Sequence, residues 1–285
     1  MSEATGGVVI VAGAALVHAG MAGVLRDLVD RTNIGVFNSW AAKGLFPWNH
    51  PAHLGTIGMQ AEDIDLCAIA TFDDVVLCGL SDDELSRGEL TRRGVPWRDV
   101  EPGDLDGLLL PEQPVPTPRP PLFDLLASVC APMYADESLP CSPARAAADL
   151  AAALPPRGLV SSDAGRSGFW LGRTFPTREL GSILLPTRAT PGFAATQAAT
   201  VRRTGRFSVA VMDGVDAATE SVMARAADLV IEVWSEDGDA LTPPDRVARL
   251  LEANAAGGVQ VLSLGVRFSD IDVLIGVSGA PLWHP

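Results

Sequence analysis

The sequence predicts an α/β protein built from two tandem doubly wound parallel-sheet domains of the Rossmann-like kind. Three observations predict this class: apolar runs that end at glycine, amphipathic helical segments between those runs, and a restart of the same alternation after a proline-rich stretch. A continuous apolar run is typical of a strand buried on both faces of a parallel sheet, and strands alternating with helices indicate parallel connections. With 47% apolar residues in 285, the chain has enough core for two such domains.

The first half opens with the run GVVIVAG at residues 7–13, which predicts a buried strand. Residues 20–31 follow with helical spacing, because Met21, Leu25 and Leu28 share one face of a helix. The other elements expected in this half are a strand at 34–37, a loop rich in Gly, Pro, Trp and His at 40–58, a short helix starting at 61–64 and a strand at 74–79.

A proline-rich segment separates the two halves. Residues 111–121 hold six prolines in eleven positions, and such a segment is extended and stiff. We therefore expect a first domain at 1–110, a linker at 111–121 and a second domain at 122–285.

The alternation of expected strands and helices resumes after this segment. Thr242 before Pro243 predicts the start of the last expected helix, since threonine caps a first turn and proline suits the first helical position. We expect helices near 122–130, 143–154, 193–203, 217–227 and 243–256, and strands near 158–162, 207–212, 228–234 and 259–264.

Charge and composition exclude several function classes. Lysine and arginine number 21 against 35 aspartates and glutamates, which gives a net charge of −14. Such a surface repels phosphate backbones and anionic lipid, so nucleic acid and membranes are not expected as partners. No apolar run approaches the ~20 residues of a membrane span, the N-terminus lacks a secretory pattern, and the four cysteines form no C-x-x-C pair. We expect a cytoplasmic protein with free thiols.

Four motifs of the first half occur in a set order. They are the strand from Val8 to Gly13, AKGLFPWNHP at 42–51, HLGTIGM at 53–59 and VVLCG at 75–79. As a set they resemble the central domain of thiamine-diphosphate-dependent enzymes of the acetolactate synthase and benzoylformate decarboxylase type. The resemblance implies a Rossmann-like domain that holds FAD or an adenine nucleotide in some members and nothing in others.

Two features of the first half bear on such a nucleotide. The first turn, GAALVHAG at 13–20, lacks the Gly-x-Gly-x-x-Gly fingerprint of dinucleotide-binding domains. The loop GTIGM at 55–59 matches the place where flavin-binding members contact FAD, and a structural tight loop explains its glycines as well. The sequence favours the tight loop, with FAD or an adenine nucleotide as the alternative.

The second half carries SDAG at 162–165, PGFA at 191–194 and MDG at 212–214, each beside an expected strand or helix. These motifs look like the same family's diphosphate-binding domain, in which Asp-Gly ends the first half of a metal motif. The resemblance implies thiamine diphosphate and Mg²⁺ as cofactors. It assigns cofactor binding to Asp163, Gly165, Pro191, Gly192, Asp213 and Gly214, and metal binding to Asp213, Glu236 and Asp237.

The sequence differs from the family pattern in three respects. The N-terminal pyrimidine-binding domain, which carries the glutamate that activates the cofactor, is not expected, because the chain begins where the central domain would begin. Met212 replaces a glycine of the metal motif, where a side chain would crowd a diphosphate. The family's second metal motif, an asparagine pair, is replaced by acidic residues around Glu236 and Asp237. Asp213 and Asp216 therefore have a second interpretation as ordinary turn and capping residues.

Two function hypotheses follow. In the first, the chain is a component of a split thiamine-diphosphate enzyme, and a separate pyrimidine-domain subunit completes it for 2-oxo acid decarboxylation or carboligation. The isolated chain would then be inactive as a lyase or transferase, and the functional form would be a hetero-oligomer. In the second, the chain is a non-catalytic homologue that acts as a binding, structural or regulatory subunit, in a homo- or hetero-oligomer.

Overall fold

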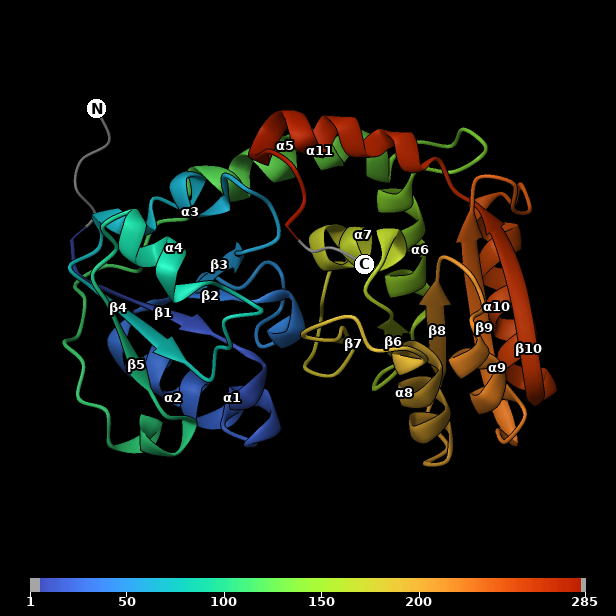
Figure 1. Cartoon of the computed structure of the whole chain (residues 1–285), viewed down its shortest axis with the longest axis horizontal. Coiled ribbons are helices and arrows are strands. Elements are labelled where there is room, and N and C mark those ends of the chain that lie inside the picture. Colours follow the sequence, from blue (N-terminus) through green and yellow to red (C-terminus); the bar gives the residue numbers. More distant parts are fainter. Residues whose placement is uncertain (1–5, 283–285) are drawn as a thin grey trace. The chain divides into compact units, whose positions relative to one another are not determined.

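The computed structural model describes residues 6–282 and divides into two compact units (Figure 1). Unit 1 contains the chain up to Ala127 together with Val277–Leu282, and unit 2 contains Ser128–Gly276. Each unit holds one five-stranded sheet in which all paired strands are parallel. The predicted fold class, two doubly wound α/β domains, is therefore confirmed. Within residues 6–282, no helix is long and apolar enough to cross a membrane.

The sheet of unit 1 has the strand order β3-β2-β1-β4-β5. Its strands are β1 (Val8–Ala12), β2 (Gly35–Asn38), β3 (His53–Thr56), β4 (Asp74–Cys78) and β5 (Trp97–Val100). Its helices are α1 (Ala14–His18), α2 (Ala22–Thr32), α3 (Asp63–Leu66) and α4 (Arg87–Arg92), with single 3₁₀ turns at Trp40–Ala42, Ile69–Thr71 and Pro102–Gly107.

Successive residues of the central strand β1 serve the two faces of this sheet. Val8, Ile10 and Ala12 pack with α1 and α2 in one apolar cluster, whereas Val9 and Val11 pack with α3 and α4 in another. Because both faces are covered, every residue of β1 is buried. This explains why the strand reads as an unbroken apolar run rather than as an alternating pattern.

The proline-rich segment belongs to unit 1 and is not a free linker. Thr117 Oγ1 accepts a hydrogen bond from Gly35 N at 2.8 Å, and Gln113 Nε2 donates to Val8 O at 2.7 Å. The predicted boundary at 111–121 is therefore corrected to Ala127/Ser128, inside α5 (Pro121–Tyr134). The extended backbone that proline imposes leaves its neighbours free to bond sideways to β1 and β2.

The last described residues also return to unit 1, a feature that the sequence did not predict. Ser278 Oγ donates to Asp63 Oδ1 at 2.6 Å, and Gln60 Nε2 donates to Gly279 O at 2.6 Å. The backbone of Leu282 donates to Met59 O at 2.8 Å. The segment Val277–Leu282 is thus bound along the loop before α3.

Unit 2 has the strand order β10-β9-β8-β6-β7. Its strands are β6 (Leu159–Ser162), β7 (Ile183–Leu184), β8 (Ser208–Met212), β9 (Asp228–Ser235) and β10 (Gly258–Gly265). Its helices include α6 (Pro143–Ala153), α7 (Arg166–Thr174), α8 (Phe193–Arg202), α9 (Ala217–Met223) and α10 (Pro243–Ala256); α11 (Ile271–Ser278) leads back toward unit 1.

A buried ion pair fixes α10 to β9. Arg246, 1% exposed, donates through Nε and Nη2 to the Glu232 carboxylate at 2.8 and 2.6 Å. Its Nη1 donates to Ala146 O of α6 at 2.6 Å, and the Trp234 indole donates to Glu232 at 2.8 Å. Every charged group in this cluster has a partner, which a buried charge requires.

Replacing Arg246 by methionine leaves the Glu232 carboxylate buried without its cation. We expect the free energy of unfolding to fall by about 3–5 kcal/mol, measured by denaturant unfolding followed by circular dichroism. Arg249 is the matched control, since it pairs with Asp239 at 2.6 Å on the surface, and Arg249→Met should cost less than ~1 kcal/mol. Equal losses in the two variants would contradict the role given to the buried pair.

Candidate functional site

A pocket lies at the carboxyl edge of the unit 2 sheet, beside β6 and β8. Its volume is about 260 Å³, and its lining includes Asp163 after β6 and Met212 and Asp213 at the end of β8. The chain leaves β6 for β7 on one side and reaches β8 on the other, so this is the point where the strand order reverses. Ligand sites of open α/β sheets lie at such a point.

Asp213 binds the first turn of α7. Its Oδ2 accepts a hydrogen bond from Arg166 N at 2.6 Å and its Oδ1 accepts one from Ser167 N at 2.8 Å. A Cβ added at Gly165 would lie 2.5 Å from Asp213 Oδ2, so glycine at this position allows the approach. The carboxylate thus satisfies two amides that a helix start leaves without a partner inside the helix.

Two further aspartates accept hydrogen bonds from the first turns of the neighbouring helices. Asp163 Oδ1 accepts a hydrogen bond from Ala194 N in the first turn of α8 at 2.8 Å. Asp216 is the N-cap of α9 and accepts one from Thr219 N at 2.6 Å. The three helix N-termini nearest the pocket are therefore each bonded to a carboxylate of the chain itself, where the helix dipole favours negative charge.

The three carboxylates give the pocket a negative field. Burial raises the pKa of Asp163, and the nearby charges of Asp216 and Asp213 raise it further, against the hydrogen bond from Ala194. The Thr219 amide and hydroxyl lower the pKa of Asp216. Lysine and arginine are missing from the residues that line the pocket in the described part of unit 2.

The structure brings most of the predicted cofactor-binding residues together. Asp163, Gly165, Pro191, Asp213 and Gly214 all line the pocket, and Gly192 starts α8 in the left-handed region at φ +68°. The interpretation of Asp216 as a capping residue agrees with the structure. Asp213 also caps a helix, but the helix is α7, which the sequence did not predict.

The structure places the predicted metal-binding residues apart from one another. Glu236 and Asp237 follow β9, lie outside the pocket lining and are exposed, and Glu236 lies 3.8 Å from Arg166 Nη1. Both oxygens of Asp213 already accept backbone hydrogen bonds. Among residues 6–282, no group of three or more His, Cys, Asp or Glu side chains is placed to hold a metal ion.

These residues do not fit a diphosphate with its Mg²⁺. A helix N-terminus binds phosphate through free amides and its positive dipole end, and here Arg166, Ser167, Ala194 and Thr219 donate those amides to aspartates. Three carboxylates repel an entering anion, and both oxygens of Asp213 and one oxygen of Asp163, which Mg²⁺ would need as ligands, already accept backbone hydrogen bonds. No reaction step through thiamine diphosphate follows from this geometry.

The corresponding edge of unit 1 is closed in the same manner by Glu84. This side chain is 2% exposed, and its Oε1 accepts from Ala14 N at 2.9 Å and from Ser39 Oγ at 2.5 Å. Its Oε2 accepts from the backbone and the hydroxyl of Ser81, each at 2.9 Å. Ala14 begins α1 directly after β1, where the strand order of this sheet reverses.

The surrounding backbone leaves little room at this edge. A Cβ on Gly13 would lie 2.3 Å from Gly79 O, and one on Gly58, at φ +89°, would lie 2.5 Å from Glu84 O. In the loop 55–59, Gly58 therefore serves a tight turn against the Glu84 backbone. This supports the structural interpretation of that loop over the flavin contact.

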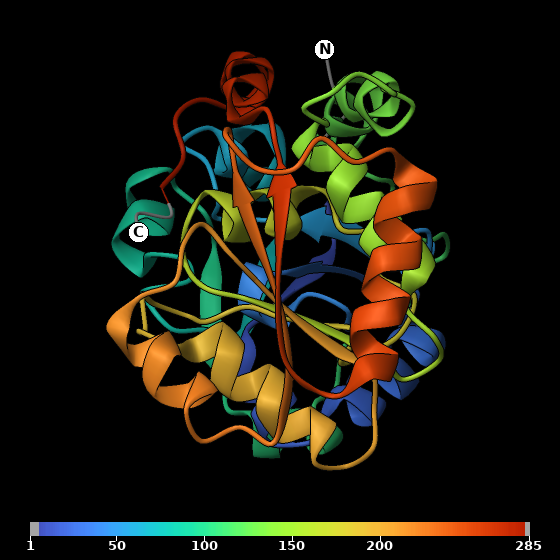
Figure 2. The ribbon, with the colours of Figure 1, turned by 90° about the vertical axis from the view of Figure 1, so that its right-hand side faces the viewer.

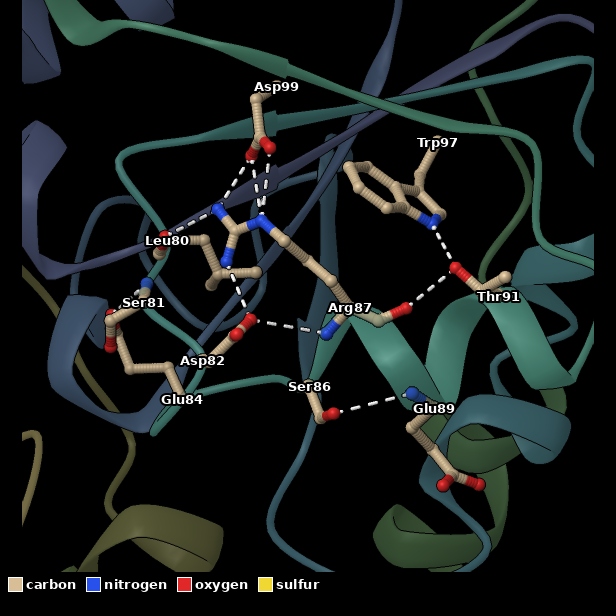
Figure 3. Close-up of polar contacts among 10 residues, drawn as sticks. All are labelled: Leu80, Ser81, Asp82, Glu84, Ser86, Arg87, Glu89, Thr91, Trp97 and Asp99. Carbon is tan, nitrogen blue, oxygen red and sulfur yellow. Dashed lines mark hydrogen bonds and ion pairs between the residues drawn. The ribbon is translucent and has the colours of Figure 1, made fainter.

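Arg87 fixes the loop that carries Glu84 (Figure 3). Its guanidinium donates to Asp99 of β5 at 3.0 Å, to Asp82 at 2.8 Å and to Leu80 O at 2.9 Å. The side-chain and backbone hydrogen bonds from Arg87 to Asp82 hold the pKa of Asp82 below its ordinary value. Ser86 caps the following helix α4 by accepting from Glu89 N, so the end of the Glu84 loop is fixed to α4 and, through Arg87, to β5.

Comparisons with known proteins confirm the resemblance that the sequence predicts. Residues 4–96 match the family model for the thiamine pyrophosphate enzyme central domain, whereas no curated protein matches the sequence. An X-ray structure assigned as a thiamin diphosphate-dependent enzyme from Mycobacterium smegmatis is similar with a TM-score of 0.66 and 16% identity, over 91% of this chain and 61% of that one. Benzoylformate decarboxylase from Polynucleobacter necessarius is similar with a TM-score of 0.67 and 13% identity, over 92% and 62%.

At these identities the solved structures share the fold of the chain. The chain spans about three fifths of their length. The central-domain match covers the first four strands of unit 1, and the similarity of unit 2 rests on the arrangement of its sheet and helices.

Removing the Asp213 carboxylate leaves two amides of α7 without their acceptor. We expect Asp213→Ala to lower the free energy of unfolding by about 1–2 kcal/mol, and Asp213→Asn, which keeps one acceptor oxygen, by less. Denaturant unfolding measures both. Asp237→Ala, on the exposed turn after β9, should stay within ~0.5 kcal/mol of the parent chain; a loss as large as that of Asp213→Ala would argue against specific capping.

Removing the Glu84 carboxylate leaves buried donors at Ala14 and Ser81 unsatisfied. We expect Glu84→Ala to cost about 2–4 kcal/mol, because each unsatisfied buried donor costs about 1–3 kcal/mol. The exposed neighbour Asp83 provides the control in the same loop, with a change of at most ~0.5 kcal/mol expected for Asp83→Ala. A Glu84→Ala protein as stable as the control would show that Glu84 does not hold this edge.

Proposed function

We propose that this chain, a relative of the thiamine pyrophosphate enzymes, acts as a non-catalytic structural or regulatory subunit. The observation that carries the proposal is the bonding of Asp213 to both first amides of α7. Each oxygen of this carboxylate accepts a backbone hydrogen bond, so a metal ion at Asp213 would compete with the start of α7 for the same oxygens. The family fold is retained in both units while the anion-binding chemistry at the switch point is replaced.

The charge balance of the pocket supports the same proposal. Asp163 and Asp216 add two carboxylates to that of Asp213 around one cavity of about 260 Å³. A site that binds a diphosphate needs donors or cations that outweigh the anion's own charge. Here the nearest donors are already used within the chain, so a diphosphate would have to displace hydrogen bonds and face like charge.

The partner that we propose is a catalytically complete enzyme of the same family. Both units keep the doubly wound arrangement of the solved relatives over more than nine tenths of this chain. A chain that keeps this fold could pack against such a relative through surfaces of the same shape. In this role the chain would add to or regulate the assembly, and the chemistry would belong to the partner.

A second candidate is the cofactor-binding component of a split enzyme, completed by a pyrimidine-domain subunit. The observation that favours it is the gathering of Asp163, Gly165, Pro191 and Asp213 at one pocket, as the family resemblance implies. Under this hypothesis the assembled complex would catalyse 2-oxo acid decarboxylation or carboligation. Binding of the partner would have to release the aspartates from their helices before a cofactor could enter.

Titration calorimetry with thiamine diphosphate and Mg²⁺ separates the two candidates. We expect no saturable heat for the full chain, either alone or mixed with a pyrimidine-domain chain from the same host. Micromolar binding, about −8 kcal/mol, that appears only in the mixture would support the split enzyme. The same affinity for the chain alone would contradict the lack of fit argued above, and Asp213→Asn in that case tests whether Asp213 is a ligand.

A further inference from the structure

The returning segment, Val277–Leu282, adds a short strand to the loop 59–63 of unit 1. Three backbone hydrogen bonds join the two: Glu62 N to Ser278 O at 3.0 Å, Ala61 N to Ala280 O at 3.0 Å, and Leu282 N to Met59 O at 2.8 Å. Between them, Gln60 and Pro281 form an antiparallel bridge. In Figure 2 the red trace that leaves α11 shows the end of this segment as extended chain.

Two side-chain contacts make this attachment selective for sequence. The buried Ser278 Oγ donates to Asp63 Oδ1 at 2.6 Å, and Gln60 Nε2 donates to Gly279 O at 2.6 Å. Gly279 has φ +75°, and a Cβ at this position would lie 3.2 Å from the Cβ of Ala61. The loop 59–63 therefore recognises a hydroxyl side chain that is followed directly by glycine.

The loop 59–63 is held in shape by contacts that do not involve the returning segment. Asp63 Oδ2 accepts hydrogen bonds from Met59 N and Gln60 N at 2.8 and 3.1 Å. Arg93, the C-cap of α4, donates through Nη2 to Ala61 O at 3.2 Å. The loop is thus organised by unit 1 itself, and its outward donors and acceptors keep their places when the segment leaves.

The returning segment buries little apolar surface in this contact. Ala280 and Leu282 are exposed, and Gly279 and Pro281 are half-buried. A hydrogen bond within the protein replaces one to water, so its net contribution to stability is modest, and ordering the segment costs conformational entropy. A segment attached in this way opens more readily than the buried strands of the sheet.

We propose that the loop 59–63 is a peptide-binding site and that the returning segment is its exchangeable, built-in occupant. A peptide that adds a strand to exposed backbone gains affinity from main-chain hydrogen bonds and specificity from its side chains. The ligand class is an uncharged peptide in which serine and glycine precede proline, as in VSGAPL at 277–282. A carboxylate in place of the Ser278 hydroxyl would face Asp63, so the site rejects acidic peptides.

The returning segment acts as a competitor for its own site. A tethered segment competes at an effective concentration of millimolar order, so a peptide in solution enters only when the segment is loosened. The contacts that hold the segment all belong to unit 1. The proposal is therefore independent of cofactor binding and of the function proposed for the pocket of unit 2.

Hydrogen exchange of the full chain, followed by NMR, tests whether the segment opens separately from the fold. We expect the amides of Ala61 and Glu62 to exchange at least about tenfold faster in Gly279→Ala and in Ser278→Asp, while the amides of β1 keep their parent rates. Gly276→Ala is the matched control and should behave like the parent, because a Cβ at this position meets nothing within 4 Å. Equal acceleration in β1, or no acceleration at Ala61 and Glu62 in either variant, would overturn the proposal.

Added peptide tests the exchange directly. The probe is the acetylated peptide of residues 277–282, mixed at up to millimolar concentration with the full-length Gly279→Ala chain. We expect it to return the exchange of Ala61 and Glu62 toward the parent rates, whereas the same peptide with the Gly279→Ala change should have no effect. Two amides that stay unprotected at millimolar peptide, or equal protection by both peptides, would contradict a selective peptide site.

Discussion

The bond between a helix N-terminus and a carboxylate of the same chain is the interaction on which the rest of the structure depends. In unit 2, Asp163, Asp213 and Asp216 each bind the start of a different helix at the carboxyl edge of the sheet. In unit 1, Glu84 binds the start of α1 in the same position relative to its sheet. Both edges are therefore stable without a bound anion, because the positive helix ends already have their negative partners.

This constraint limits what the shared fold implies about the chemistry of the chain. Residues 4–96 match the central-domain model of the thiamine pyrophosphate enzymes, and the chain shares its fold with solved structures of such enzymes. A fold, however, carries a function only through the groups at its site. Where an anion would need free amides, the chain offers carboxylates that already accept hydrogen bonds from those amides.

Much of the fold follows from local sequence signals. The strands β1, β4, β6, β8, β9 and β10 and the helices α2, α8 and α10 lie close to their predicted ranges, since each is an apolar run or a helical repeat with clear ends. The strands β3 and β5 have no such apolar run in the sequence. Gly55 stands at φ +120° beside a register shift in β3, and β5 is a half-exposed edge strand with Arg98 and Asp99 in its middle.

The site was predicted less completely than the fold, because its hydrogen bonds join residues that are far apart in the sequence. The family resemblance assigned Asp163, Gly165 and Asp213 to cofactor binding, and these residues line one pocket. It did not identify α7, because Gly168 and Gly172 interrupt the helical pattern. The bond from Ser167 to Asp213 spans 46 positions, so its existence depends on the pairing of β6 with β8 and not on any local pattern. The closure by Glu84, 70 positions from Ala14, escaped prediction for the same reason.

The amide resonances of Arg166, Ser167, Ala194 and Thr219 report directly on whether these helix starts belong to the chain or to a ligand. Their ¹H and ¹⁵N shifts can be followed by NMR while thiamine diphosphate and Mg²⁺ are added to the full chain. If the aspartates hold these amides, the four resonances keep their positions to millimolar cofactor. Saturable shifts of the same four amides, centred on micromolar cofactor, would contradict the account.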